Sequence, residues 1–230
     1  MWGRPTGAAC ENRSFSVEIM KNLSMTKIKS IVGRGVKSLK GSLWDDPECY
    51  WPQEGKQNGL PERNLSLHVG SIFLHQGWNA YSEPSYPGKT NQRLDLLVFR
   101  HGVLIACECK QLDMADRAGA FAEDIKRLKD FRMTRSWDTK EWKAPNASVR
   151  YGLLLAVTWN LKVKEWWMYK GKHRYLPASL SGPGWRNLGM ELAKIDRTMK
   201  TVYGNLWLNR LDDKEEPDFW ALYAIFRLPK

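Results

Sequence analysis

Two apolar runs separated by a short turn constrain the fold of this 230-residue chain more than any other feature. The runs are residues 94–100 and 103–110, and His101 and Gly102 stand between them. Because glycine readily adopts the positive φ that two-residue hairpin turns require, the pattern predicts an antiparallel β-hairpin. If these two residues form the turn, the register of every opposed pair in the two strands follows.

The predicted register places two carboxylates opposite each other. Asp95 falls across from Glu108, and strand alternation puts Glu108 and Lys110 on one face, with Cys107 and Cys109 on the other. Like charges in opposed positions destabilise a strand pair by roughly 0.2–1 kcal/mol, so their presence in apolar strands calls for a reason. A divalent cation supplies one, because Mg²⁺ binds a few carboxylate oxygens together with water and substrate phosphate. The backbone carbonyl of Cys109 is a further candidate oxygen ligand, and a salt bridge from Lys110 to one of the acids is the structural alternative.

The segments around the hairpin predict an α/β core. They are a helix that starts near Pro61 and ends at Gly77, a strand over 78–84, a loop over 85–91, an amphipathic helix over 115–132 and a buried strand over 151–158. With the hairpin, this order is α-β-β-β-α-β, which indicates a mixed central sheet flanked by helices. Glu62 then lies in the first turn of the first helix.

The remaining segments extend this core at both ends. Residues 1–60 are expected to form a partly irregular N-terminal extension, with a helix over 14–31 that glycines 33, 35 and 41 bring to an end. Residues 61–175 form the core, in which 165–169 has the composition of a further strand. Residues 176–230 are expected to add a helix near 188–198 and a final strand over 219–228, which pack on the core.

The charge of the chain points to a polyanionic partner. Lys and Arg number 36 against 25 Asp and Glu, a formal net charge of +11. Residues 116–175 hold 14 basic and 7 acidic residues, so most of the excess follows the hairpin directly. A nucleic-acid backbone is the polyanion expected there. The candidate contacts are Lys126, Arg127, Lys129, Arg132 and Arg135.

Composition excludes other classes of protein. No apolar run approaches the roughly 18 residues that a membrane span needs, and the N-terminus lacks the apolar segment of a signal peptide. The four cysteines are not spaced as zinc ligands or disulfide partners. A cytoplasmic protein without a membrane partner is therefore expected.

Asp95, followed by Glu108-Cys109-Lys110, resembles the motif of the PD-(D/E)xK nuclease superfamily. The resemblance covers roughly residues 60–160, and the Glu62-Arg63 helix start is most similar to the archaeal Holliday-junction-resolvase branch and restriction-enzyme cores. One position departs from the motif, since Leu94 stands where the motif has proline. The resemblance implies a restriction-endonuclease-like fold and a Mg²⁺- or Mn²⁺-dependent endonuclease, with metal-bound water as the nucleophile.

The resemblance also implies roles for individual residues. Asp95 and Glu108 would be metal ligands, Lys110 would position water or stabilise charge, and Glu62 would be an additional acidic ligand. Glu83, on the preceding strand, is the competing candidate for that fourth role. Gln111 is a further candidate polar residue of the catalytic site.

Several functional alternatives remain open from the sequence. DNA is the expected substrate, and an RNA-directed nuclease would use the same residues. A non-catalytic nucleic-acid-binding subunit that retains the fold is the alternative from a different class. The resemblance also suggests a homodimer, since two strands must be cut, although no stretch of the sequence identifies a dimer face.

Overall fold

We describe the protein from a computed structural model, and the description covers residues 24–45, 62–86, 89–100, 102–131, 149–169, 176–207 and 219–228. Within these ranges the chain has an α/β fold with a six-stranded mixed sheet, a two-stranded sheet and five helices. None of the helices in these ranges is long and apolar enough to cross a membrane.

The large sheet carries the site described below. Its strands, in spatial order, are β1 (Asn79–Ser82), β4 (Leu96–Arg100), β5 (Val103–Gln111), β6 (Val149–Thr158), β8 (Trp220–Arg227) and β7 (Thr201–Trp207). β5 and β6 pair in parallel, and the other neighbouring strands pair antiparallel. The small sheet consists of β2 (Ser85–Tyr86) and β3 (Lys89–Arg93).

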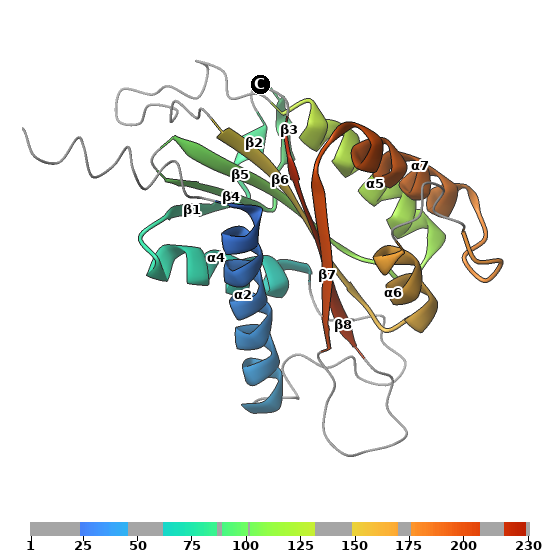
Figure 1. Cartoon of the computed structure of the whole chain (residues 1–230), viewed down its shortest axis with the longest axis horizontal. Coiled ribbons are helices and arrows are strands. Elements are labelled where there is room, and N and C mark those ends of the chain that lie inside the picture. The colour runs from blue at the N-terminus through green and yellow to red at the C-terminus, as the bar shows by residue number, and fades with distance from the viewer. Residues whose placement is uncertain are drawn as a thin grey trace, which may run out of the picture.

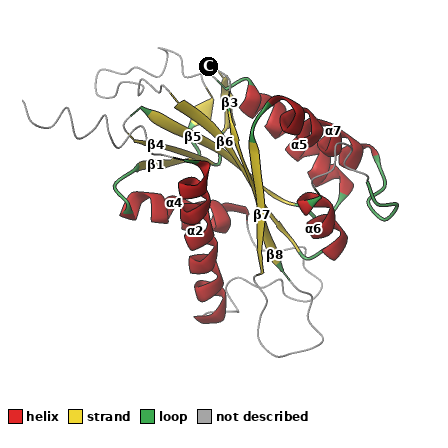
Figure 2. Cartoon of the chain, viewed as in Figure 1, coloured by secondary structure: helices red, strands yellow, loops and turns green. Residues whose placement is uncertain are grey.

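Helices cover both faces of the large sheet (Figure 1). On one face lie α2 (Met25–Asp45) and α4 (Glu62–His75), and on the other lie α5 (Ala115–Lys129), α6 (Leu161–Met168) and α7 (Pro183–Thr198). Figure 2 shows the resulting three layers, with strands between two groups of helices. Each helix layer has its own apolar core against the sheet, so the central strands β5, β6 and β8 are buried on both faces.

The hairpin prediction is confirmed. β4 and β5 pair antiparallel with Arg100 opposite Val103 and Leu96 opposite Cys107, which is the predicted register. The predicted alternation is confirmed as well, because Cys107 and Cys109 are buried in the core beneath α2 and α4. The even-numbered residues of β5, which include Glu108, therefore face the layer of α5.

The expectation of an irregular segment at glycines 33, 35 and 41 is wrong for residues 25–45. α2 runs through all three glycines and buries five apolar side chains against the sheet and α4. At Gly35 a Cβ atom would lie 2.6 Å from the Cα of Val69 in α4. The glycine therefore allows two helices to approach closely, and tertiary packing outweighs its low helix propensity. Residues 1–23 and 46–61 lie outside the described residues.

Three other segments differ from expectation. The predicted loop at 85–91 contains β2 and the start of β3. The strand predicted at 165–169 is wrong, because residues 165–168 form the end of α6. Asn160 caps this helix at its N-terminus, and the helix buries Val163, Trp166 and Trp167 at helical spacing. β7 was not expected from the sequence; within it, Gly204 leaves room for the ring of Tyr223 on the neighbouring strand β8.

Candidate active site

The candidate site lies at the carboxyl end of β5, where both helix layers reach the same edge of the sheet. β5 carries Glu108 and Lys110, and the segment just before β4 carries Asp95. Glu62 is the first residue of α4, on one side of the sheet, and Asp124 lies in α5 on the other. Two strands and two helices thus bring their ionisable side chains to one place.

Asp95 and Glu108 are in contact. Asp95 lies one residue before β4, where its Oδ2 accepts a hydrogen bond from the Cys109 backbone N–H at 2.6 Å and its carboxyl group is also hydrogen bonded by the Glu108 side chain. Burial raises the pKa of Asp95 despite these hydrogen bonds and the charge of Lys110, and the charge of Glu62 raises it further. Glu108 is only 2% exposed. The pair of acids inferred from the hairpin register is therefore present, with Glu108 buried and Asp95 half-buried.

Lys110 lies between two carboxylates. Its Nζ is 3.5 Å from Glu62 Oε2 and 3.4 Å from Asp124 Oδ2. Burial acts to lower the pKa of Lys110, but the charges of Asp124, Glu62 and Asp95 outweigh it and raise the pKa above its usual value. The lysine therefore keeps its positive charge at neutral pH and can stabilise negative charge, but it is not a base.

The structure places Glu62, rather than Glu83, against the strand that carries the motif. Glu62 Oε1 accepts a hydrogen bond from the Gln111 backbone N–H at 2.8 Å, across 49 residues of sequence. The carboxylate of Glu83 instead pairs with two arginines, Arg63 at 3.0 Å and Arg93 at 3.4 Å. Of the two acids considered for the additional role, Glu62 is the one that contacts Lys110.

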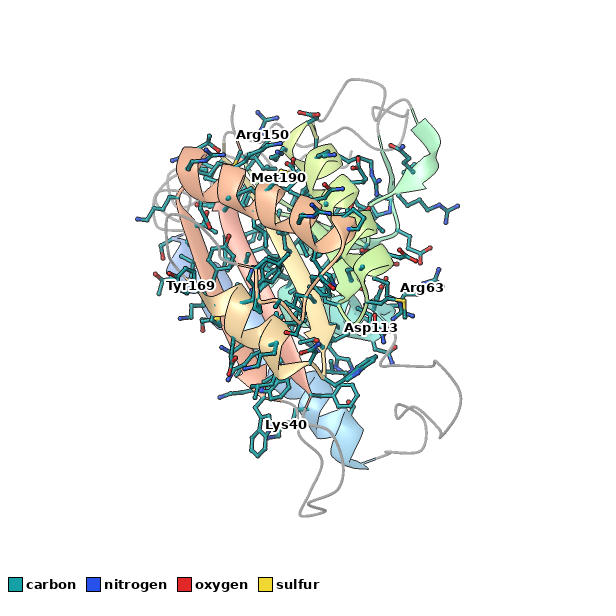
Figure 3. All side chains as sticks on the ribbon, turned by 90° about the vertical axis from the view of Figure 1, so that its right-hand side faces the viewer. Lys40, Arg63, Asp113, Arg150, Tyr169 and Met190 are labelled. Atoms are coloured by element: carbon teal, nitrogen blue, oxygen red, sulfur yellow. The ribbon has the colours of Figure 1, made fainter. Side chains whose placement is uncertain are left out.

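Gln111 is buried, and its side chain faces the loop before α5. Its Nε2 donates to Asp113 Oδ2 at 3.2 Å, and the same oxygen pairs with Arg117 at 3.2 Å. Arg63 and Asp113, both labelled in Figure 3, lie on the same side of the molecule. The backbone of Gln111 therefore holds Glu62 in place, while its side chain orders the segment that leads into α5.

Asp124 was missed from the sequence, although the structure makes it a neighbour of Lys110. Its side chain is 8% exposed and pairs with both Lys110 and Arg127. The sequence feature that could have revealed Asp124 is its position between Phe121 and Ile125 on the buried face of α5. An acid on the apolar face of a helix needs a cationic partner inside the protein.

The basic residues predicted to contact nucleic acid have other partners on α5. Lys126 pairs with Glu123, Arg127 with Asp124, and Lys129 with the buried Glu191 of α7. Lys129 thereby joins two helices. The other two candidates, Arg132 and Arg135, lie outside the described residues.

The residues present suit a divalent cation held by few protein ligands. No group of three or more His, Cys, Asp and Glu side chains is placed to hold a metal ion in the described part of the chain. Mg²⁺, however, is usually bound by one or two carboxylates, with water and substrate completing its shell. The Asp95–Glu108 pair meets that need. The Cys109 carbonyl points to the same side of β5 as the Cys109 N–H, which donates to Asp95.

The charge of the site also favours a divalent cation. Asp113 and Asp124 each have an arginine partner, Arg117 and Arg127 respectively. The hydrogen bond between Asp95 and Glu108 requires one shared proton; once that proton is lost, the carboxylates of Glu62, Asp95 and Glu108 exceed the ammonium of Lys110 by two negative charges. One divalent cation would balance that excess.

Comparisons with known proteins do not assign a family. No protein-family model matches the chain, and no curated protein or solved structure matches it.

Proposed function

We propose that this protein is a metal-dependent nuclease that hydrolyses phosphodiester bonds in DNA, built on a restriction-endonuclease-like core. The observation that carries the proposal is the contact of Asp95 with Glu108 beside a charged Lys110, at the end of a central strand. The chain order α4-β1-β4-β5-α5-β6, interrupted between β1 and β4 by the small β2–β3 sheet, supports it, because α-β-β-β-α-β is the order expected for such a core.

The residues divide the chemistry among them. Asp95, Glu108 and the Cys109 carbonyl would hold Mg²⁺ or Mn²⁺, which when bound acts as a Lewis acid on the phosphate and lowers the pKa of water. Lys110 remains protonated and donates hydrogen bonds to oxygens on which negative charge develops during hydrolysis. Glu62 and Asp124 hold the ammonium of Lys110 from opposite sides of the sheet.

A cleavage assay tests the proposal. Plasmid DNA, linear DNA and RNA of matched sequence are incubated with the protein in Mg²⁺, Mn²⁺ or EDTA. We expect cleavage of DNA in either metal and none in EDTA. Lys110→Met should lower the rate by about 100-fold or more, the scale of losing one charge-stabilising group.

The control variant is Lys162→Met, which removes a lysine of α6 that pairs with Glu165 one turn away. It should cleave at the wild-type rate, and circular dichroism checks the fold of both variants. Cleavage that persists in EDTA or in Lys110→Met would overturn the mechanism. DNA binding without cleavage in any metal would favour the non-catalytic binding subunit, and cleavage of RNA alone would reassign the substrate.

A further inference from the structure

Glu83 lies between two exposed arginines beside the candidate site. Its Oε1 is 3.0 Å from Arg63 Nε and its Oε2 is 3.4 Å from Arg93 Nη1, so each carboxylate oxygen has one guanidinium partner. The side chains of Arg63 and Arg93 are 82% and 61% exposed, against 34% for Glu83. Two cations that solvent can reach are thus neutralised by one carboxylate of the same chain.

This cluster is joined to the site through the backbone. Arg63 directly follows Glu62 in α4. The Glu83 N–H donates to the Asp95 carbonyl at 3.3 Å, and the Leu94 N–H donates to the Pro84 carbonyl at 3.0 Å. The segment that bears Glu83 therefore runs alongside the segment that bears Asp95, and an anion bound at the arginines would lie near the metal-binding carboxylates.

The backbone at Glu83 is unusual. Its φ is +50°, and among the described residues it is the one non-glycine residue with positive φ. Glycine or asparagine adopts this conformation more readily than glutamate does. A glutamate kept in an unfavourable conformation indicates a role for its carboxylate, and the role visible in the structure is to occupy Arg63 and Arg93.

We propose that Arg63 and Arg93 form a binding site for backbone phosphates of the nucleic-acid substrate, and that the Glu83 carboxylate occupies this site in the free protein. The proposal rests on the proposed function, because it takes the nearby carboxylates as the centre at which a phosphodiester is cut. Exposed ion pairs are worth little, so a polyanion can displace Glu83 at small cost. Arginine suits the task because its planar guanidinium binds phosphate oxygens through two parallel hydrogen bonds.

As an internal competitor of DNA, Glu83 would weaken DNA binding, whereas a metal-ligand carboxylate would support metal binding and cleavage. Loss of a ligand carboxylate weakens metal binding and cleavage. Loss of an internal competitor releases two arginines and removes one negative charge close to the path of the DNA backbone. Substitution of Glu83 should therefore strengthen DNA binding.

Binding measured without chemistry tests this directly. Fluorescence anisotropy of labelled duplex DNA is followed in EDTA over a series of salt concentrations, for wild type, Glu83→Gln and Glu83→Asn. Glu83→Asn is included because asparagine adopts positive φ readily. A change in DNA binding by this variant therefore cannot come from strain in the backbone at position 83. We expect both variants to bind DNA about threefold to tenfold more tightly than wild type at low salt, the range of one or two exposed ion pairs.

Two further variants control for charge and for the arginines. Glu165→Gln removes an exposed glutamate of α6 that pairs with Lys162, and its effect measures the loss of one negative charge elsewhere. The double variant Arg63→Gln/Arg93→Gln should weaken binding. It should also reduce the slope of log K against log salt by about 1 for each lost phosphate contact.

The outcomes separate this proposal from the proposed nuclease activity. Binding by both Glu83 variants that is no tighter than that of Glu165→Gln, or an unchanged salt slope in the double arginine variant, overturns the arginine site. Loss of cleavage in Glu83→Gln with unchanged DNA binding would instead make Glu83 a member of the catalytic site. Tighter binding by the Glu83 variants, in a protein that cleaves no DNA with any metal, would keep the arginine site and refute the nuclease.

Discussion

Lys110 shows how the surroundings of a residue decide what it can do. A lysine at the end of an apolar strand would lose part of its charged form through burial alone. Here Asp124, Glu62 and Asp95 outweigh burial, so the pKa of Lys110 is raised and the ammonium is retained. The residue can therefore serve as a fixed positive charge over the whole neutral range.

Asp124 is the residue whose substitution tests this arrangement best. Asp124→Asn keeps the shape of the side chain and removes the charge that holds Lys110 and Arg127. For the proposed cleavage of DNA we expect kcat to fall about tenfold with KM within about twofold, because a displaced ammonium affects charge development more than binding. Asp124→Glu, which restores the charge, should recover part of the activity.

The matched control for Asp124 is its neighbour in α5. Glu123 is exposed and pairs with Lys126, so Glu123→Gln removes one charge from the same helix without touching Lys110. It should leave both kinetic constants at wild-type values. Equal effects of the two substitutions, or a change in KM alone, would show that Asp124 does not position the lysine.

At the scale of elements, tertiary packing decides whether a helix continues through its glycines. Glycines 33, 35 and 41 predict a break, whereas α2 continues through all of them and packs on α4. Helix propensity describes the stability of an isolated segment. A close helix–helix contact contributes further stability to the helix, and that contribution depends on residues far away in sequence. By contrast, α4 and the β4–β5 hairpin were predictable, because residues close together in the sequence set their pattern.

The glycines of α2 also provide a test of this packing. A Cβ atom at position 35 would meet the backbone of Val69 at 2.6 Å, while at position 41 nothing lies within 4 Å. Gly35→Ala should therefore destabilise the protein by about 1–3 kcal/mol, the usual cost of overpacking. Gly41→Ala should stabilise it by about 0.5–1 kcal/mol, since alanine favours the helix. Urea unfolding measures both, and equal shifts would contradict the close α2–α4 contact.

At the scale of the whole molecule, charge is used inside the fold as well as on its surface. The net charge of +11 predicts a basic surface beside the candidate site, and on α5 the basic side chains Lys126, Arg127 and Lys129 form ion pairs. Glu191 of α7 is the clearest case, because it is 2% exposed and pairs with Lys129 of α5 and Lys194 of α7. Part of the positive charge therefore stabilises the packing of α5 and α7.

Glu191 should make the stability of the protein depend on pH. Burial acts to raise the pKa of Glu191, but hydrogen bonds from Lys129 and Lys194 outweigh it and lower the pKa below its usual 4.5. A lowered pKa in the folded state means that the stabilisation is complete above about pH 4.5 and is lost as the pH falls below that value. Glu191→Gln should cost about 1–3 kcal/mol at pH 7 and less at pH 3, measured by urea unfolding. The same loss at both pH values would refute the role of this ion pair.

The sequence by itself determined the features that depend on near neighbours along the chain. The register that brings Asp95 to Glu108 follows from a two-residue turn and from the alternation of side chains along a strand. The separation of Lys110 from the cysteines of β5 follows from the same alternation.

Only the tertiary structure decided the contacts between distant segments. Glu62 bonds the Gln111 backbone across 49 residues, and Asp124 reaches Lys110 from a helix on the other face of the sheet. Glu83 was the competing candidate to Glu62 in the sequence, and the fold directs its carboxylate to Arg63 and Arg93. The physical reason is that an ion pair needs two side chains within a few ångströms of each other. That separation depends on how helices and loops pack on the sheet, and the sequence pattern alone does not give it.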